Sequence, residues 1–201
     1  MKATIAALLI TAATVCQPAL AQENTGYSKV YDATYDYYMP SGPTQMRLSC
    51  DGMGRIRSET VMNGRSFVSV TDANQKATFS IDDSTRAVSK MAMQNTPGLP
   101  SSSSSQRVSL GDKMVEGRLC EGWQTTTASG KKSEAWIDKS LGCPVLMTLD
   151  NKPQMRIKTS STNSIGAQYF APPPGYRLVD MNEQVRRAQE NAKKYQNGRN
   201  K

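Results

Sequence analysis

Short apolar runs separated by turn-forming residues recur along most of this chain, and this pattern limits the fold more than any other feature of the sequence. The clearest turn is Asn63-Gly64, because both residues tolerate the positive φ that a two-residue hairpin requires. The turn predicts three cross-strand pairs: Met62 with Arg65, Thr60 with Phe67, and Arg57 with Val70. A similar reversal at residues 51–52 predicts a three-stranded meander over residues 45–72.

Further strands are predicted on both sides of this meander. Before it lie Tyr27, Tyr31, Tyr35, Tyr37 and Tyr38, and the four odd-numbered tyrosines share one strand face, where they cover the sheet. After it, strands are expected at residues 77–81, 87–93, 115–127, 134–138, 145–149 and 154–158. Together these elements indicate an antiparallel sheet that is open or curved.

The second half of the chain holds both tryptophans. A two-residue turn at Ser129-Gly130 would pair the flanking strands so that Trp123 lies directly opposite Trp136. Cross-strand aromatic pairs contribute about 0.2–1 kcal/mol to a sheet. The tryptophan pair is interpreted either as part of the core or as the wall of an apolar pocket.

The N-terminus, residues 1–21, is predicted to be a secretory signal peptide. Lys2 supplies a positive start, residues 3–16 form an apolar run that is short for a membrane span, and Ala19 and Ala21 form a small-x-small cleavage site. An N-terminal membrane anchor is the alternative. Cleavage leaves 24 basic and 17 acidic residues, a net charge of +7, in a periplasmic or secreted protein.

Export places the three cysteines that follow the signal peptide in an oxidising compartment. The register above puts Cys120 opposite Lys139, and a bend at residues 141–142 would return Cys143 toward it. A Cys120–Cys143 disulfide is therefore predicted, and three buried, reduced thiols, including Cys50, are the alternative. The chain has no CxxC spacing, which argues against a redox motif or a zinc knuckle.

Residues 22–180 are predicted to form one domain, followed by a basic helix and tail over residues 181–201. Residues 94–106 hold two prolines and five consecutive serines and are expected to form a surface loop within that domain. Asp180 precedes Glu183 by three residues, as in a capping box, and apolar residues then recur every three or four positions. The helix is interpreted as a solvated element at the domain edge, with attraction to anionic lipid or polysaccharide as the alternative.

Three short motifs carry a resemblance to a known family: Val115-x-Gly117-x-x-Cys120, Trp136-Ile-Asp-x-x-Leu141-Gly142-x-Pro144 and Phe170-x-x-Pro173-x-Gly175-Tyr176. Over residues 27–179 the chain resembles a domain-of-unknown-function family of exported bacterial proteins, which is similar in pattern to the periplasmic lipoprotein carriers of the Lol pathway. The resemblance implies a mainly antiparallel β fold with a strongly curved open sheet, a half-barrel. Its concave side would be covered by helical segments and hold acyl chains or another apolar ligand.

The chain has no histidine, which excludes serine–histidine and cysteine–histidine nucleophile pairs and histidine-ligated zinc. Asp82 and Asp83 adjoin each other, but at a predicted turn, where aspartate favours local backbone hydrogen bonding. The basic residues do not alternate with aromatic residues as they do on a nucleic-acid stacking platform. A binding protein without enzymatic activity, cofactor or nucleic-acid partner is therefore predicted.

The expected ligand is apolar: a lipid, an acyl chain or a lipoprotein, held in the concavity of the sheet. Ten methionines follow Met1, and flexible thioethers suit a surface that accepts varied apolar shapes. The predicted lining residues are Trp123, Trp136, Met91 and Met93. One alternative is a structural or partner-binding envelope protein. Another is a Cu(I) site at Met91 and Met93, since thioethers bind that soft cation.

Overall fold

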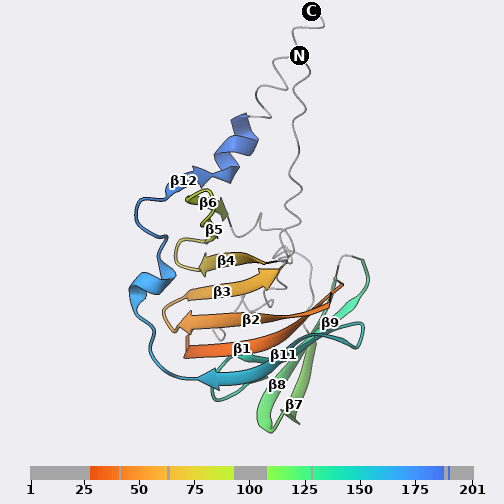
Figure 1. Cartoon of the computed structure of the whole chain (residues 1–201). Coiled ribbons are helices and arrows are strands. Elements are labelled where there is room, and N and C mark those ends of the chain that lie inside the picture. Colours follow the sequence, from red (N-terminus) through yellow and green to blue (C-terminus); the bar gives the residue numbers. More distant parts are fainter. Residues whose placement is uncertain are drawn as a thin grey trace, which may run out of the picture.

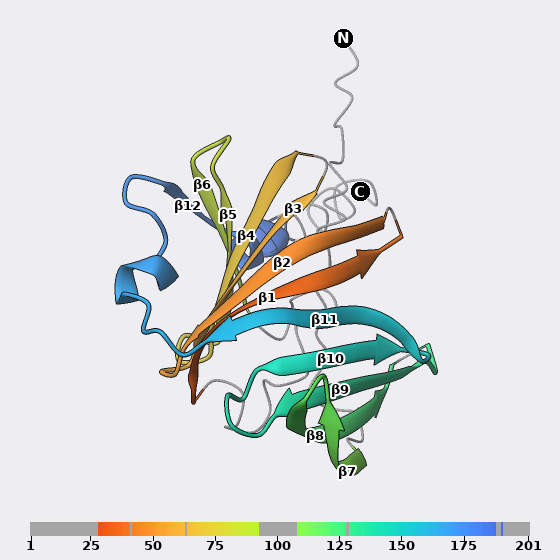
Figure 2. The same cartoon turned by 60° about the horizontal axis from the view of Figure 1, so that its bottom comes forward.

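The chain forms one curved, unclosed sheet, which Figures 1 and 2 show from two sides. The computed structural model describes residues 28–40, 42–62, 64–92, 108–127, 129–187 and 190. The strands are β1 (Val30–Met39), β2 (Gly42–Asp51), β3 (Arg55–Met62), β4 (Arg65–Asp72), β5 (Ala77–Asp82), β6 (Ala87–Ala92), β7 (Val108–Val115), β8 (Arg118–Thr126), β9 (Lys132–Asp138), β10 (Pro144–Leu149), β11 (Lys152–Ser161) and β12 (Arg177–Asp180). A 3-10 helix, η3 (Ala167–Phe170), lies between β11 and β12.

These strands pair in the order β12-β6-β5-β4-β3-β2-β1-β11-β10-β9-β8-β7. Every pair is antiparallel except β12 with β6, which is parallel. The outermost strands, β12 and β7, do not pair with each other, so the sheet stays open. The mainly antiparallel, strongly curved open sheet predicted from the sequence is therefore confirmed.

The meander predicted for the first half of the chain is confirmed in its register. Met62 pairs with Arg65, Thr60 with Phe67, and Arg57 with Val70, as the hairpin at residues 63–64 requires. Gly64 has φ 74°, in the left-handed region that glycine enters without steric cost. The strong local turn and the alternation of buried side chains in β3 therefore specify the same register.

The hairpin of β8 and β9 differs from the prediction by one residue. Trp136 pairs with Gly122, and Trp123 pairs with Ala135, because five residues, 127–131, connect the strands in place of a two-residue turn. The Thr127 amide donates to the Lys131 carbonyl at 2.8 Å and closes this loop. The predicted Trp123–Trp136 pair is therefore wrong, and the two rings lie on opposite faces of the hairpin.

The curvature of the sheet brings together strands that are not neighbours. Arg118 on β8 donates through Nη2 to Ser160 Oγ on β11 at 3.0 Å, although β9 and β10 lie between these strands in the sheet order. Register shifts interrupt the pairs β1–β11, β10–β11, β9–β10 and β7–β8. Such bulges bend strands and increase their twist, and all four lie in the half of the sheet that runs from β1 to β7.

Each side of the sheet carries its own hydrophobic cluster. We call the side that bears Arg118 and Ser160 the inner face and the opposite side the outer face. The inner cluster contains Tyr31, Ala33, Tyr35, Tyr37, Met46, Leu48, Cys50, Ile56, Val115, Cys120, Trp136, Cys143, Val145, Met147, Met155 and Ile157. The outer cluster contains Val68, Val70, Ala77, Phe79, Ile81 and Val88, covered by Phe170 of η3.

The helix after β12 begins at Met181 and continues through residue 187. Its predicted cap is confirmed, because Asp180 Oδ1 accepts hydrogen bonds from the backbone amides of Asn182 at 2.9 Å and Glu183 at 3.2 Å. In the described part of the chain, no helix has the length and hydrophobicity needed to cross a membrane. The predicted signal peptide, with Ala19 and Ala21, and the predicted loop at 94–106 lie outside the described residues.

Candidate ligand-binding face

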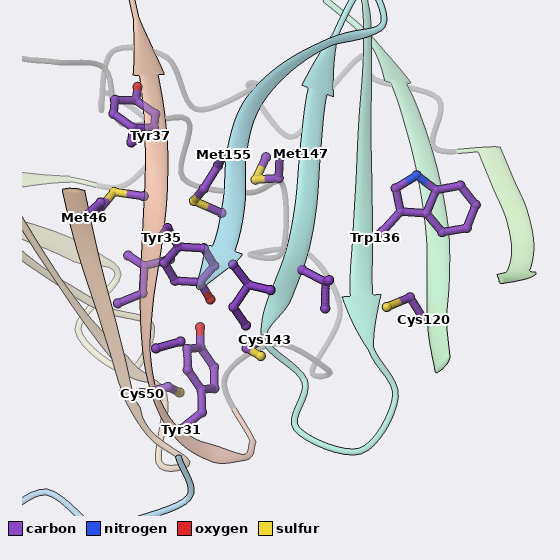
Figure 3. Packing of buried hydrophobic residues seen from close by; sticks show 14 of the residues in the cluster. Tyr31, Tyr35, Tyr37, Met46, Cys50, Cys120, Trp136, Cys143, Met147 and Met155 are labelled. Atoms are coloured by element: carbon purple, nitrogen blue, oxygen red, sulfur yellow. The ribbon is translucent and has the colours of Figure 1, made fainter. Parts of the chain in front are cut away.

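Tyrosine and methionine side chains dominate the inner face around β1 (Figure 3). The register places Tyr35 between Met46 on β2 and Ile157 on β11, and Tyr37 beside Met155. Tyr35 has no exposed surface, and Met46, Met147 and Met155 are at most 3% exposed. Thioethers and aromatic rings attract each other and adapt to irregular shapes, so these side chains pack into one continuous apolar cluster.

The inner face becomes more polar across β3, β4 and β5, where hydroxyl groups replace the apolar side chains. Ser58 and Ser69 share a hydrogen bond of 2.8 Å between their Oγ atoms, and Thr71 and Thr78 share one of 3.3 Å. Thr60 donates to the Gln45 carbonyl at 3.0 Å. These hydrogen bonds join β2 to β3, β3 to β4, and β4 to β5 through side chains as well as through the backbone.

A partly buried ion pair lies where β8 approaches β11. Asp138 is 3% exposed and accepts hydrogen bonds from Arg118 Nη1 at 2.9 Å and from the Ser140 hydroxyl at 2.5 Å. Burial by itself raises the pKa of Asp138, but hydrogen bonds from Ser140, Arg118 and the Leu141 amide outweigh it and hold the pKa below its usual value. The charge of Arg118 is therefore balanced within the fold.

The three cysteines of the described residues are buried free thiols. Burial raises the pKa of Cys50 and of Cys143 to about 11, and it also raises the pKa of Cys120. The predicted Cys120–Cys143 disulfide is therefore absent from this structure, which matches the alternative of three reduced thiols. The predicted bend does exist, because the Asp138 amide donates to the Cys143 carbonyl at 2.9 Å. In the strands before this bend, Cys120 pairs with Asp138 and not with Lys139 as predicted.

The predicted lining residues separate into different places. Trp136 belongs to the inner cluster and is 5% exposed, with Lys113 Nζ 4.2 Å from its ring centroid. Trp123 is half-buried on the opposite face of the β8–β9 hairpin. Met91 is half-buried on β6 opposite Thr78, at the hydroxyl-rich end of the inner face, and Met93 lies outside the described residues. Of the four, Trp136 and Met91 therefore lie on the inner face.

The sequence did not identify the methionines that line the inner face. Met46, Met147 and Met155 come from three strands, and only the sheet order β2-β1-β11-β10 brings them around Tyr35 and Tyr37. The odd-numbered tyrosines were the available signal, because period-two spacing already placed them on one strand face.

The sequence also did not predict a role for the aromatic residues of η3, which pack this segment against the outer face. The guanidinium carbon of Arg57 lies 4.4 Å from the ring centroid of Tyr169, and Arg57 Nη1 donates to the Tyr169 carbonyl at 3.1 Å. Arg55 lies 5.4 Å from the Phe170 ring centroid. These cation–π contacts leave the inner face clear of η3.

No protein-family model matches the chain, and no curated protein matches it. Among solved structures, an uncharacterized conserved protein from Thermus thermophilus matches at 12% identity, over 81% of this chain and 96% of that chain, with a TM-score of 0.57. PNGF-II matches at 9% identity over 76% of this chain and 31% of that chain, with a TM-score of 0.54. At these identities both similarities show the fold alone.

The matches also include a LolA superfamily protein from Nitrosomonas europaea, at 7% identity over 76% of this chain and 96% of that chain. This agrees with the resemblance to the lipoprotein carriers predicted from the sequence. The TM-score of that match is 0.36.

Proposed function

We propose that this protein binds an apolar chain, such as the acyl chain of a lipid or lipoprotein, on the inner face of its curved sheet. The observation that carries the proposal is the inner cluster itself: large tyrosine and methionine side chains gathered on the curled side of an open sheet. A sheet needs only one such face to fold, and here the outer face supplies a second cluster under Phe170.

The inner face favours binding over catalysis. Its ion pair, Arg118 with Asp138, is internally balanced, and its thiols have raised pKa values that keep them protonated near neutral pH. A nucleophile or general base needs the opposite, a group whose pKa lies near the working pH. We therefore propose a non-enzymatic binding protein, exported by the signal peptide predicted at residues 1–21 and consisting of one domain over residues 22–180.

The two tryptophans provide a test of where the ligand binds. In a Trp123→Phe variant, all tryptophan emission comes from Trp136 on the inner face. Methyl 9,10-dibromostearate quenches tryptophan on contact, so titration should give saturable quenching of Trp136. The matched Trp136→Phe variant retains Trp123 on the outer face and should show little quenching. Equal quenching of both variants, or quenching of neither, would contradict the proposal.

Native mass spectrometry of the purified protein provides a second, independent test. A carrier is expected to retain a lipid through gentle purification, and the added mass would identify the ligand. The same spectrum gives the mass of the chain, and processing after Ala21 should leave Gln22 as the first residue.

A partner-binding function is the second candidate, and a different surface favours it. On the outer side of the β7–β8 hairpin, Met114 pairs with Leu119, and these side chains are 62% and 50% exposed. Exposed apolar pairs next to a free sheet edge are typical of protein interfaces. Replacing both residues with serine should abolish capture of a partner while leaving the quenching of Trp136 unchanged.

A further inference from the structure

The strand β7 has a free edge at one end of the sheet. Within the described chain β7 pairs with β8 alone, and Figure 2 shows it as the last strand beyond β8. Seven of its eight residues are exposed. The strand at the other end of the sheet, β12, has four residues, so β7 offers the longer free edge. Unpaired backbone groups on an edge strand form a template for pairing with another chain.

The turn between β7 and β8 determines which backbone groups of β7 point away from the sheet. Glu116 and Gly117 have φ 48° and 74°, and positive φ at both central residues is typical of a type I′ turn. The residues that flank this turn, Val115 and Arg118, are therefore a hydrogen-bonded pair. Hydrogen-bonded pairs alternate with non-hydrogen-bonded pairs along the hairpin, so residues 111, 113 and 115 direct their amides and carbonyls toward β8.

The even-numbered residues between them, Met114 and Asp112, consequently direct their amides and carbonyls away from β8. A contact on the other side of the hairpin agrees with this alternation. The carbonyl of Leu119, which is opposite Met114, accepts a hydrogen bond from the Lys139 amide at 3.0 Å and so points toward β9. A register shift precedes residue 111, which leaves residues 111–115 as the regular part of the free edge.

The side chains beside this edge are apolar and acidic on the outer face. Met114 and Leu119 are 62% and 50% exposed, and the next outer pair joins Asp112 to Glu121, two like charges directly opposite each other. Such a pair destabilises a sheet. Lys139 Nζ lies 2.5 Å from Asp112 Oδ2, and within the described residues no ion pair joins a cation to Glu121. Two carboxylates therefore share one ammonium group beside an exposed apolar pair.

The charges on β7 disfavour a second copy of this chain as the occupant of the edge. Two antiparallel β7 strands would be related by a twofold axis, which sets one residue opposite itself. The register that pairs all of residues 111–115 would place Lys113 opposite Lys113, and the neighbouring register would place Asp112 opposite Asp112. Both registers oppose like charges.

We propose that β7 binds an extended segment of another protein as an added strand, with an apolar side chain beside Met114 and a lysine or arginine two positions away, beside Asp112. The backbone of the segment would pair with the free amides and carbonyls of these two residues. Side chains two positions apart share a face, so the basic group would balance the carboxylate pair. This inference rests on the partner-binding candidate and not on the binding of an apolar chain.

A phage-displayed library of random nonapeptides, selected on the chain from residue 22 onward, tests the chemistry of the partner. Enriched peptides should share an apolar residue two positions from a lysine or arginine. For a synthetic enriched peptide, measured by fluorescence anisotropy, Asp112→Asn combined with Glu121→Gln should lower the affinity about two- to fivefold at low salt. Met114→Ser should lower it about tenfold, because it removes apolar surface that the peptide would cover.

Proline variants and N-methylated peptides test the backbone pairing. Met114→Pro removes an amide that points away from β8, so it should abolish peptide binding and change the melting temperature little. Lys113→Pro is the matched control for the register, because it removes an amide that pairs with Cys120 and should lower the melting temperature clearly. N-methylation of every second peptide residue should weaken binding at least tenfold in one of the two alternate sets, since only one set of amides faces β7.

Peptide binding that survives Met114→Pro, or equal effects of the two N-methylated sets, would overturn strand addition. Enrichment of acidic residues in place of basic ones, or of no common motif, would overturn the partner chemistry. A dimer of the free protein that Met114→Pro dissociates in sedimentation would show that the occupant is a second copy. Quenching of Trp136 by methyl 9,10-dibromostearate should be the same with and without Met114→Pro, so failure of strand addition is distinguished from failure of apolar-chain binding.

Discussion

Three cysteines without bridges show how strongly burial controls side-chain chemistry in this protein. Cys50, Cys120 and Cys143 are all 0% exposed, and removal from water disfavours the thiolate at each of them. The thiolate is the form that reacts with alkylating agents and with disulfides. These side chains therefore behave as small apolar core residues.

We expect the folded protein to resist iodoacetamide at pH 8, because two of these thiols have a pKa of about 11 and all three are buried. After unfolding in guanidinium without reductant, the chain from residue 22 onward should take up three carbamidomethyl groups. Intact mass spectrometry measures both states. Uptake of one group after unfolding would instead reveal a disulfide.

Asp138 should contribute stability that depends on pH. Its pKa is lowered in the fold, so its contribution is complete above about pH 4, where the unfolded carboxyl is also ionised, and is lost as the pH falls toward the folded-state pKa. Asp138→Asn leaves Arg118 without its charge partner and should cost about 3 kcal/mol at pH 7. The variant should also lose less stability than the parent between pH 5 and acid.

Asp112→Asn is the matched control for that variant. It breaks the ion pair of Asp112 with Lys139, in which both side chains are nearly half exposed, so it should change the free energy of unfolding little. Urea denaturation across pH measures both variants. Equal losses for the two would show that the burial of Asp138 has no energetic consequence.

At the scale of single residues, the sequence predicted positions better than contacts. The spacing of Tyr31, Tyr35 and Tyr37 placed them on one face, since side chains alternate along a strand. Asp180 was predicted as a cap because its partners lie within three residues. The contacts of Tyr35 and Tyr37 with Ile157 and Met155 depend on a strand more than 110 residues away, which no local pattern shows.

At the scale of elements, the length of a loop decides which residues face each other. Asn63-Gly64 predicted its hairpin correctly because the sequence strongly prefers that turn. Between β8 and β9, residues 127–131 form a longer loop, and the one-residue shift moves Trp136 from Trp123 to Gly122. Pairing with Gly122 matters for packing, because this residue has no side chain and so leaves room for the indole ring of Trp136.

Gly122→Ala should destabilise the protein by about 1–3 kcal/mol, the usual cost of overpacking. A Cβ atom at this position would lie less than 3.0 Å from three atoms of the Trp136 ring. Thermal denaturation of Gly122→Ala, Trp136→Leu and the double variant measures the coupling. In the double variant the alanine should add little, because a leucine leaves room for it. If the losses of stability in the two single variants add up in the double variant, the destabilisation by Gly122→Ala does not come from contact with the Trp136 ring.

At the scale of the whole molecule, one sheet carries two hydrophobic clusters on opposite faces. Strands β3 and β4 are hydrogen-bonded to each other, and β3 contributes Ile56 to the inner cluster while β4 contributes Val70 to the outer cluster. Shared pairing of this kind makes separate unfolding of the two clusters costly. We therefore expect a single cooperative transition.

Phe170→Ala tests that expectation from the outer face. Phe170 is 2% exposed, and its truncation should cost about 3–5 kcal/mol, which lowers the melting temperature of a domain of this size by about 6–20 °C. Trp136 fluorescence on the inner face and far-UV circular dichroism should shift together. Two separated transitions would contradict cooperativity. Val185→Ala, at a residue 52% exposed, should change the midpoint little.

The whole architecture could be predicted only in part from the sequence. The strand series indicated an antiparallel sheet, and the resemblance to the carriers implied its curvature. The parallel pairing of β12 with β6 and the exposed edge strand β7 were missed. β7 lacks alternation because solvent reaches both of its faces, and β12 has four residues, too few for a periodic signal.

Because β1 lies in the middle of the sheet, one of its two partner strands is synthesised long after it. Among the described strands β1 emerges first, yet one of its edges pairs with β11, which begins more than 110 residues later. At ordinary translation speeds this interval lasts roughly 6–23 s, during which the Tyr31–Tyr37 edge has no native partner. An edge exposed for so long is a natural binding site for holdase chaperones, so depletion of such chaperones should lower the yield of this protein more than that of a protein built from consecutive hairpins.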